Sequence, residues 1–519
     1  MKLPTKILPL ILGVALLFSC KNDNQKTKSI AVVKTNYYTE PYRPQFHFSP
    51  EEKWMNDPNG MVYHKGVYHL FYQYYPEDIV WGPMHWGHAT SKDLVRWEHQ
   101  PIALFPDKHG LIFSGSAVVD IANTSGFGSA ENPPLVAIFT YHLMKGEKAG
   151  RNDFQTQGIA YSLDNGDTWT KYEGNPVIEN DGIKDFRDPK VFWDEANRTW
   201  VMALVAGDHL QLWNSENLKE WTKLSEFGKD EGAHGGVWEC PDLFPIKVEG
   251  SDEEKWVLLI SINPGAPNGG SGTQYFVGNF DGEKFTTDQT EIKWLDWGTD
   301  NYAGVTYYNA PKDDRIFIGW MSNWAYARDT PTEKWRSAMT LPRKLSLQKI
   351  QGDYSLFNYP VKNLEAIVDR KGKKNITVVG GAKEVVSFDS LNQAEVSFLT
   401  SARNFQLKLS NSLDEEVLLT LFGEEEQFFL DRTNSGKVAF QEDFASIQIM
   451  PVTGLPEEEY EVRLFIDHSS IEVFMNKGQY VMTAQLFPNE NYTNLTIENL
   501  GDSEIRLKDF EINGVKRIW

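Results

Sequence analysis

Short stretches of alternating apolar and polar residues run along most of the chain, from about Phe46 to the C-terminus. Apolar runs such as MVYHKGVYHLFYQYY, PLVAIFTYH and TWVMALVAG are bounded by Gly, Asn, Asp and Pro. Such runs are typical of β-strands, and no long stretch shows the 3.6-residue period of a helix. The pattern therefore predicts an all-β protein.

A weak internal repeat recurs within residues 45–347. Its three copies, SKDLVRWEHQP, SLDNGDTWTKYEGNP and SENLKEWTKLS, begin at Ser91, Ser162 and Ser215. Each copy has a serine, an acid or amide, a turn and then a Trp. Such spacing is typical of β-propeller blades, and about 300 residues at roughly 50–60 per blade give five blades. A sandwich that contains Trp-bearing hairpins by chance is the alternative.

The sequence changes character after Leu347. In residues 348–374 a short helical stripe of apolar residues precedes a lysine-rich end, which predicts a linker with a short helix. Residues 375–519 return to alternating runs such as AEVSFLT, FQLKLS and SSIEVFMN, which are typical of an antiparallel β-sandwich. The predicted order is a five-bladed β-propeller over residues 45–347, the linker and then the sandwich.

The first residues, MKLPTKILPLILGVALLFSC, combine two lysines with an apolar run from Ile7 to Phe18. That run is too short to span a bilayer comfortably and is typical of a signal peptide. The letters LFSC resemble a bacterial lipobox, in which Cys20 would be lipidated; an ordinary signal peptide with a chance cysteine is the alternative. We expect a lipoprotein signal peptide over residues 1–19, a polar tether over residues 20–44, and an exported protein anchored to a membrane, in the periplasm or at the cell surface.

Charge and composition narrow the class of partner. The formal net charge is −21, and the acidic residues are spread along the chain. The sequence has no sustained basic stretch, which argues against a nucleic-acid partner. Aromatic residues make up 13% of the chain, and their flat rings pack well against sugars. A neutral, hydroxyl-rich substrate fits this balance. With Cys20 lipidated, Cys240 is the only other cysteine, so no intramolecular disulfide is expected.

Three acids stand beside turn residues at the ends of apolar strands: Asp57 in WMNDPNG, Asp188 in KDFRDPK and Glu239 in GGVWECPDLF. Taken alone, Pro-Asn-Gly after Asp57 is most often a β-turn, and Arg187-Asp188 is usually a surface ion pair. Glu239 stands out because carboxylates rarely lie among apolar neighbours without a partner. In a propeller the inner strands converge at one end of the channel, so acids distant in sequence can meet there.

These blocks resemble glycoside hydrolase family 32, the β-fructosidases that include invertases, inulinases and levanases. The resemblance covers about residue 44 to the C-terminus and rests on WMNDPNG, FYQYYP, WGPMHWGHATSKDLVRW, FSGSAV, FRDPK, WECPDLF, GTDNYAG and SSIEVFMNKG, in the family's order. It implies a five-bladed propeller with an acidic pocket, followed by a β-sandwich. It also implies that Asp57 is the nucleophile, Glu239 the general acid/base and Asp188 the residue that stabilises the transition state.

The resemblance further implies a substrate pocket around the acids, although a structural role in the core is the alternative for each of its members. The predicted substrate-binding residues are Asn56, Gln73, Trp81, Phe113, Ser114, Arg187 and Trp324. The Tyr-Tyr-Pro that follows Gln73 departs from the Asn-Pro common in the family, at what would be the pocket rim. His85 and His88 lie three apart on a predicted strand and face opposite sides, so we expect no catalytic metal. We also expect no cofactor.

The activity that this resemblance implies is a retaining hydrolysis of terminal β-D-fructofuranosyl residues from levan or inulin, with sucrose as a further substrate. One carboxylate attacks the anomeric carbon while the acid protonates the leaving oxygen, and water then hydrolyses the fructosyl-enzyme. An endo-acting levanase or inulinase, a non-catalytic fructan-binding lipoprotein, and a relative acting on arabinan or xylan are the alternatives. The sequence leaves open linkage, exo or endo action, chain length, oligomeric state and membrane leaflet.

Overall fold

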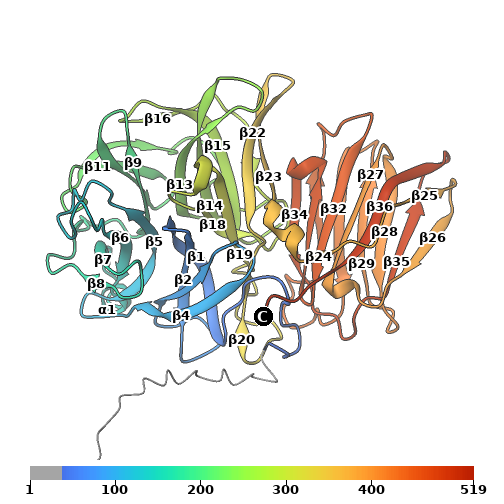
Figure 1. Ribbon diagram of the computed structural model, residues 1–519, viewed down its shortest axis with the longest axis horizontal. Coiled ribbons are helices and arrows are strands. Elements are labelled where there is room, and N and C mark those ends of the chain that lie inside the picture. The colour runs from blue at the N-terminus through green and yellow to red at the C-terminus, as the bar shows by residue number, and fades with distance from the viewer. Residues whose placement is uncertain (1–37) are drawn as a thin grey trace, which may run out of the picture. The chain divides into compact units, whose positions relative to one another are not determined.

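The computed structural model describes residues 38–519 (Figure 1). The predicted signal peptide, Cys20 and most of the predicted tether lie outside the described residues. Strands dominate the described part, and the all-β prediction is confirmed. The helical elements found there are α1 (Met144–Lys148), η1 (Pro311–Asp313), η2 (Lys362–Ala366), η3 (Leu391–Gln393) and η4 (Asn476–Gly478). Within residues 38–519, no helix is long and apolar enough to cross a membrane.

The first three sheets follow one another along the chain, and neighbouring strands within each are antiparallel unless stated. The first sheet contains β1 (Lys53–His64), β2 (Val67–Tyr75), β3 (His85–Ser91) and β4 (Trp97–Leu104), with β20 (Trp335–Arg336) parallel to β1. The second contains β5 (Leu111–Val119), β6 (Leu135–His142), β7 (Gln155–Ser162) and β8 (Thr170–Lys171). The third contains β9 (Phe186–Asp194), β10 (Thr199–Ala206), β11 (Leu210–Ser215) and β12 (Thr222–Phe227).

Two more sheets of the same kind complete the N-terminal part. The fourth contains β13 (Val237–Lys247), β14 (Glu254–Asn263), β15 (Gly272–Phe280) and β16 (Phe285–Thr286), with β17 (Lys293–Trp294) also beside β15. The fifth contains β18 (Tyr302–Thr306), β19 (Arg315–Met321), β22 (Arg343–Ile350) and β23 (Asp353–Pro360), with β21 (Ala338–Met339) beside β19.

The first strands of these five sheets contact one another in a closed cycle, in which β1 meets β5, β5 meets β9, β9 meets β13, β13 meets β18, and β18 meets β1. An apolar cluster fills the space between each pair of neighbouring sheets. Both faces of a sheet are therefore buried, which explains why β6 and β10 are buried along their whole length. Each cluster contains buried residues from both neighbouring sheets. Examples are Phe71 and Ala137, Ile138 and Met202, Leu212 and Trp238, Leu259 and Leu345, and Met61 and Ile318.

The three-copy repeat forms the same turn in three different sheets. Ser91, Ser162 and Ser215 are the last residues of the third strands β3, β7 and β11. In each copy the serine Oγ accepts the N–H of the residue two positions on, at 3.2–3.4 Å. This hydrogen bond turns the chain toward the fourth strand. The repeat is thus a recurrent connection between the outer strands of a sheet.

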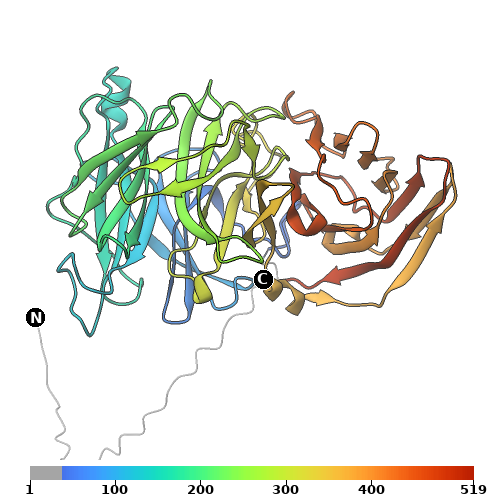
Figure 2. The same cartoon turned by 90° about the horizontal axis from the view of Figure 1, so that it is seen from above.

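The C-terminal part consists of two sheets that enclose a single apolar cluster, as expected for a sandwich (Figures 1 and 2). The seven-stranded sheet contains β24 (Val368–Asp369), β25 (Lys374–Val378), β27 (Ala394–Thr400), β32 (Tyr460–Asp467), β33 (Ser470–Met475), β34 (Tyr480–Gln485) and β36 (Ile505–Val515). The six-stranded sheet has the order β26 (Lys383–Ser387), β35 (Asn494–Asn499), β28 (Asn404–Ser410), β29 (Glu416–Phe422), β30 (Gln427–Asn434) and β31 (Ile447–Pro451).

The boundaries of the parts differ from the predicted ones at two places. The fifth sheet continues through β23 to Pro360, because a two-residue turn at Gln351-Gly352, with φ of 51° and 94°, joins β22 to β23 as a hairpin. The predicted short helix is present as η2. At the other end, Tyr38 and Arg43 belong to the folded body rather than to a tether, since both side chains are buried and the Arg43 guanidinium stacks on the Tyr38 ring.

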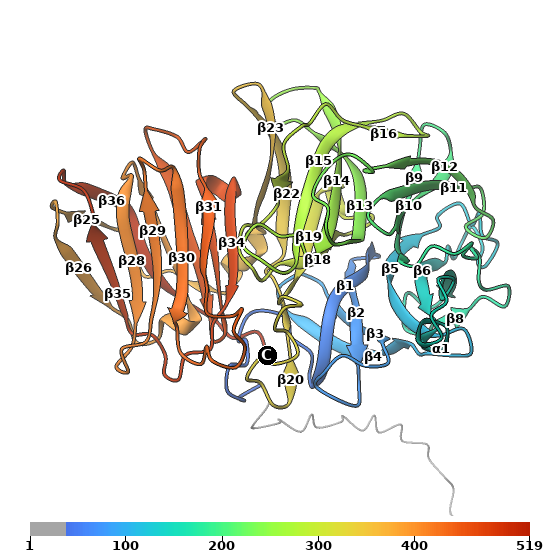
Figure 3. The ribbon, with the colours of Figure 1, turned by 180° about the vertical axis from the view of Figure 1, so that it is seen from behind.

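Buried ion pairs join the five sheets to the sandwich. Arg343 on β22 reaches Asp296 at 2.9 Å and Glu472 on β33 at 2.8 Å. His47 lies between Asp467 at 2.8 Å and the same Glu472 at 3.0 Å. Backbone contacts add to this network, because β19 of the fifth sheet also lies against β34 of the sandwich (Figure 3). The two parts therefore share an interface in which these polar groups accompany an apolar cluster that includes Phe465, Phe474 and Val481 of the sandwich.

Candidate active site

Each of the five first strands is interrupted by a β-bulge near the same end of the cycle. The register breaks lie in β1 between Met55 and Pro58, in β5 between Ile112 and Gly115, in β9 between Arg187 and Lys190, in β13 between Glu239 and Asp242, and in β18 between Tyr302 and Val305. A bulge inserts one unpaired residue and redirects its side chain. At these bulges, polar side chains of the five first strands therefore face a common space, and the regular pairing with the second strands is interrupted.

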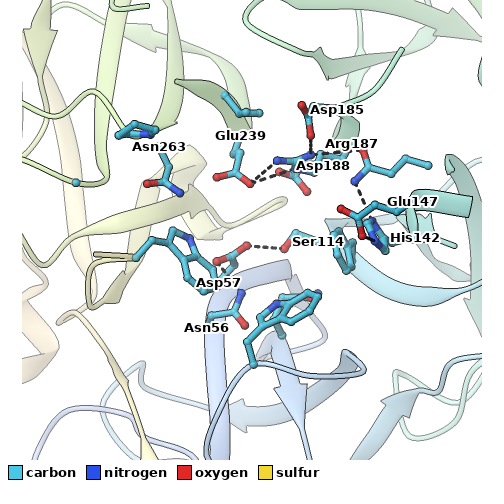
Figure 4. Close-up of a pocket in the computed structure, with 18 of the residues that line it drawn as sticks. Asn56, Asp57, Ser114, His142, Glu147, Asp185, Arg187, Asp188, Glu239 and Asn263 are labelled. Atoms are coloured by element: carbon cyan, nitrogen blue, oxygen red, sulfur yellow. Dashed lines mark hydrogen bonds and ion pairs between the residues drawn. The ribbon is translucent and has the colours of Figure 1, made fainter. Parts of the chain in front are cut away.

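That space is a cavity of about 480 Å³. It is lined by all ten predicted site residues of the folded part: Asn56, Asp57, Gln73, Trp81, Phe113, Ser114, Arg187, Asp188, Glu239 and Trp324. The carboxyl groups of Asp57 and Glu239 face each other across it, with Asp188 beside Arg187 on a third side (Figure 4). Three acids that are up to 182 positions apart in sequence thus share one pocket, as sequence reasoning expected.

Asp57 is fixed by two neighbours. The Asn56 amide donates to its Oδ1 at 3.0 Å, and the Ser114 hydroxyl donates to its Oδ2 at 2.9 Å. Asn56 is itself held by the Trp54 indole N–H, at 2.7 Å from its Oδ1. Burial, followed by the charge of Glu239, raises the pKa of Asp57 to about 6, while the two hydrogen bonds oppose that rise. Asp57 is therefore ionised at neutral pH and oriented along one direction.

Asp188 adopts a backbone conformation that is rare for a residue with a side chain, with φ of 64°. Its Oδ2 accepts the backbone N–H of Cys240 at 3.0 Å, which ties β9 to β13. Burial raises the pKa of Asp188 to about 7; Arg187 opposes this rise, whereas the charges of Glu239 and Asp57 add to it. Strained positions of this kind are held by the surrounding structure and cluster at functional sites.

Glu239 has charged and polar partners rather than the apolar neighbours that its sequence context suggested. Both Nε and Nη2 of Arg187 donate to its Oε1, at 3.1 and 3.0 Å. The Tyr302 hydroxyl donates to its Oε2. Arg187 is steadied in turn by Asp185 at 2.7 Å. The carboxyl group of Glu239 is consequently oriented by two elements, β9 and β18.

Aromatic side chains form the walls of the pocket. Trp81 and Phe113 meet edge to face with ring centroids 6.1 Å apart, and Phe113 stacks on His142 at 4.2 Å. Trp324 stacks on Trp54, with ring centroids 5.9 Å apart. Flat walls with polar groups between them suit a ring that carries several hydroxyl groups.

One polar group at the pocket has no partner within the described chain. The Gln73 side chain is buried, yet its Nε2 donates to no other described residue. An unpaired buried amide is costly, and it is expected to be satisfied by what occupies the cavity.

Sequence reasoning missed several residues at this site. Pocket-lining residues without a prediction are His142, Glu147, Phe154, Gln155, Asp185, Val237, Asn263, Pro264, Gly270, Ala325 and Arg328. Most lie on loops, whose course a periodicity pattern does not give. Tyr302 also has no predicted role, although it lies in the block GTDNYAG. Its contact with Glu239 and the positive φ of the next residue, Ala303, at 53°, exist only in the folded chain.

Within residues 38–519, no group of three or more His, Cys, Asp and Glu side chains is arranged to hold a metal ion. His88 is buried, stacks on Phe71 at 4.2 Å and pairs with His69 at 3.1 Å. His85 contacts the carbonyl of Pro83 at 2.9 Å. The carboxyl groups that line the pocket, with a guanidinium and hydroxyl groups around them, can carry out nucleophilic attack and proton transfer at an acetal.

Comparison with known proteins assigns this architecture. Residues 47–360 match the glycosyl hydrolases family 32 N-terminal domain, and residues 363–513 match the family's C-terminal domain. The levanase of Bacillus subtilis (strain 168) is 46% identical over 500 residues, which cover 93% of this chain and 72% of that protein. The extracellular exo-inulinase of Aspergillus awamori is 41% identical over 505 residues, which cover 89% of this chain and 93% of that protein.

Solved structures agree with these matches. The crystal structure of the exo-inulinase from Aspergillus awamori superposes with a TM-score of 0.84 at 38% identity, covering 93% of this chain and all of that one. The fructofuranosidase from Schwanniomyces occidentalis, solved in complex with fructose, gives a TM-score of 0.83 at 32% identity, covering 94% of this chain and 100% of that one. On the strength of both domain matches, the chain belongs to glycosyl hydrolase family 32.

Proposed function

We propose that this protein is a retaining β-fructosidase that releases terminal fructose from fructans and from sucrose. The observation that carries the proposal is the pair Asp57 and Glu239, which face each other across one cavity in a chain 46% identical to a levanase. The chain is a glycosidase by its family, and its relatives are named as levanases and exo-inulinases.

The proposed roles follow from the contacts. Asp57, ionised above about pH 6 and held by Asn56 and Ser114, attacks the anomeric carbon. Glu239 protonates the leaving oxygen and then activates the water that hydrolyses the fructosyl-enzyme, so the anomeric configuration is retained. Asp188 accepts hydrogen bonds from sugar hydroxyls, and these strengthen as positive charge develops in the transition state.

The remaining pocket residues bind the sugar. Gln73 offers an unpaired amide to a hydroxyl group, and Trp81, Phe113 and Trp324 supply flat faces. No step in this mechanism requires a metal or a cofactor.

The proposed architecture is a five-bladed β-propeller followed by a β-sandwich. Five sheets whose first strands meet in a closed cycle, with an apolar cluster at each junction, support the propeller. We place the end of its fifth blade at Pro360, where β23 ends, instead of at residue 347.

We also propose that the protein is exported and lipid-anchored through Cys20 to a bacterial membrane. The support is the apolar run before LFSC and the name of the extracellular exo-inulinases among its relatives. Labelling with a radioactive fatty acid tests the anchor. Incorporation into the intact protein and its loss in Cys20→Ala are expected; equal labelling of both would refute the anchor.

The product profile tests the activity. Purified protein is incubated with levan, inulin and sucrose, and early products are separated by chromatography. Free fructose from the first minutes supports exo action, a ladder of oligosaccharides supports the endo-acting alternative, and no product at all contradicts the enzyme. Proton NMR of the fructose released at early times reads the anomer, and an inverted first product would contradict the double displacement.

A further inference from the structure

One wall of the pocket is the loop of residues 264–271 together with Asn263, the last residue of β14. Asn263, Pro264 and Gly270 line the cavity. The loop closes on itself, because the N–H groups of Gly265 and Ala266 both donate to the carbonyl of Gly270, at 3.0 and 3.2 Å. Gly265, Gly269 and Gly270 all have positive φ. A glycine-rich loop has few side chains with which to pack, so contacts made from outside set its position.

One of these outside contacts comes from the sandwich. The Asn268 side chain donates from Nδ2 to the carbonyl of Ile449 at 2.9 Å, and its Oδ1 accepts the N–H of Ile449 at 2.9 Å. Ile449 lies on β31, the edge strand of the six-stranded sheet (Figure 3). One amide side chain thus satisfies both backbone groups of Ile449 on the open side of that edge, as a neighbouring strand would.

Further hydrogen bonds anchor the same loop to the segments that precede β18 and follow β19 of the fifth sheet. Nδ2 of Asn268 also donates to the carbonyl of Trp297 at 2.7 Å. The Asn323 amide donates to the carbonyl of Gly269 at 3.3 Å and to that of Thr299 at 2.8 Å. Because Asn323 directly precedes Trp324, the loop connects the wall at Asn263 with the wall at Trp324.

The position of the wall indicates which part of a substrate it would meet. Asn263 lies beside Glu239 (Figure 4), and β13 pairs with β14 through Glu239 and Ser261. The proposed general acid faces the leaving group. The wall next to it therefore faces the sugar units beyond the bond that is cleaved, and not the fructose held by Asp57.

We propose that Asn268 is a positioning residue through which the edge strand β31 of the sandwich holds the wall formed by Asn263 and the 264–271 loop, and thereby sets the affinity for the leaving part of the substrate. This inference rests on the proposed function. It gives the C-terminal sandwich a part in substrate recognition, although no predicted site residue lies on it.

The first test is the variant Asn268→Ala, assayed with sucrose and with long inulin and levan. We expect KM for the long fructans to rise about 5- to 10-fold, with kcat within twofold of the wild type and with a smaller change for sucrose. Asn268→Asp keeps the acceptor for the Ile449 N–H but turns a carboxylate oxygen toward the carbonyls of Ile449 and Trp297, so its KM for the long fructans should be at least as high as that of Asn268→Ala. Asn434→Ala is the matched control, since its amide bonds only the carbonyl of Asp414 within the sandwich, and its KM should not change.

The second test approaches the contact from the other side. Ile449→Pro removes the N–H that Asn268 accepts, and proline is tolerated where the N–H of an edge strand faces outward. If both residues act through one contact, Asn268→Ala combined with Ile449→Pro should show the KM of one single variant and not the product of both effects.

Two outcomes would overturn the inference. One is wild-type KM for long fructans in both single variants, and the other is an equal loss of kcat on every substrate, accompanied by a lower melting temperature. A wild-type protein that releases no fructose would refute the proposed function instead, so the two failures are distinguishable.

Discussion

Lys190 and Asp242 form a buried ion pair of 3.1 Å, two residues beyond Asp188 on β9 and three residues beyond Glu239 on β13. The Lys190 ammonium also donates to the carbonyl of Thr306 at 2.6 Å, and Asp242 accepts the N–H of Thr306 at 2.5 Å. The pair therefore fixes three of the five first strands against one another, directly behind the acids.

Removing one partner of this pair should be strongly destabilising. Asp242→Asn leaves the Lys190 ammonium buried without a carboxylate. We expect the free energy of unfolding, measured by urea denaturation, to fall by about 3–5 kcal/mol. The double variant Lys190→Met, Asp242→Asn removes the charge as well and should recover most of that loss. A single variant with the stability of the wild type would show that the pair is not what holds the strands.

Asp57→Asn should abolish activity while making the protein more stable. We expect kcat to fall at least about 10³-fold, because no nucleophile remains. Since burial raises the pKa of Asp57 to about 6, ionising this carboxyl group lowers the free energy of unfolding. The loss of stability is complete above about pH 6 and is absent below the ordinary pKa near 4. The melting temperature of the variant should therefore exceed that of the wild type at pH 7.5 and match it near pH 4.

The activity should fall on the acid side at a higher pH than an ordinary carboxylate would give. The pKa values of Asp57 and Asp188 are raised to about 6 and about 7, in both cases chiefly by burial. We expect kcat/KM to decline below an apparent pKa of 6–7. Ser114→Ala removes a hydrogen bond that lowers the pKa of Asp57, so its acid limb should move to higher pH; a shift to lower pH would contradict the assignment.

Tyr302→Phe tests whether the tyrosine orients the proposed acid. Without the hydroxyl that donates to Glu239, we expect kcat on sucrose to fall about tenfold or more, with little change in KM. An aryl β-fructoside, whose leaving group needs no protonation, should be affected much less. Equal losses on both substrates would assign Tyr302 a purely structural role.

The interface with the sandwich should make stability depend on pH in the alkaline range. Although burial lowers it, the hydrogen bonds to Asp467 and Glu472 raise the pKa of His47 to about 9. Because the pKa of His47 is higher in the folded than in the unfolded chain, the protonated His47 stabilises the folded protein by on the order of 3 kcal/mol. This stabilisation is complete below the unfolded-chain pKa near 6.5 and is lost as the pH rises through 9. Denaturation of the wild type should show this decline, and His47→Gln should show a flat profile over the same window.

Much of the fold and of the pocket could be predicted because both depend on local signals. Alternating runs gave the strands, and the Ser-to-Trp repeat gave the equivalent turns. The blocks around Asp57, Asp188 and Glu239 carried enough specific residues to indicate a shared pocket. Each of these features is contained within a dozen residues of sequence.

What escaped prediction depends on tertiary contact. Tyr302 becomes a partner of Glu239 only when β18 closes the cycle, and His142 becomes the support for Phe113 only when β5 and β6 pair. Gln351-Gly352 is not among the common hairpin pairs, so the sequence pattern alone places β23 within the predicted linker. Tyr38 and Arg43 looked like tether residues, since their partners are supplied by the folded body.

The five bulges around the pocket carry a consequence for how this site can change over evolutionary time. In an uninterrupted strand, an insertion shifts the register of all that follows and turns the core face outward. Here the extra residue is already absorbed at the rim of each sheet, and the ladder continues below it, with one further register shift in β1 between Asn59 and Val62. Substrate preference can therefore diversify one rim position at a time on a scaffold whose interior stays the same.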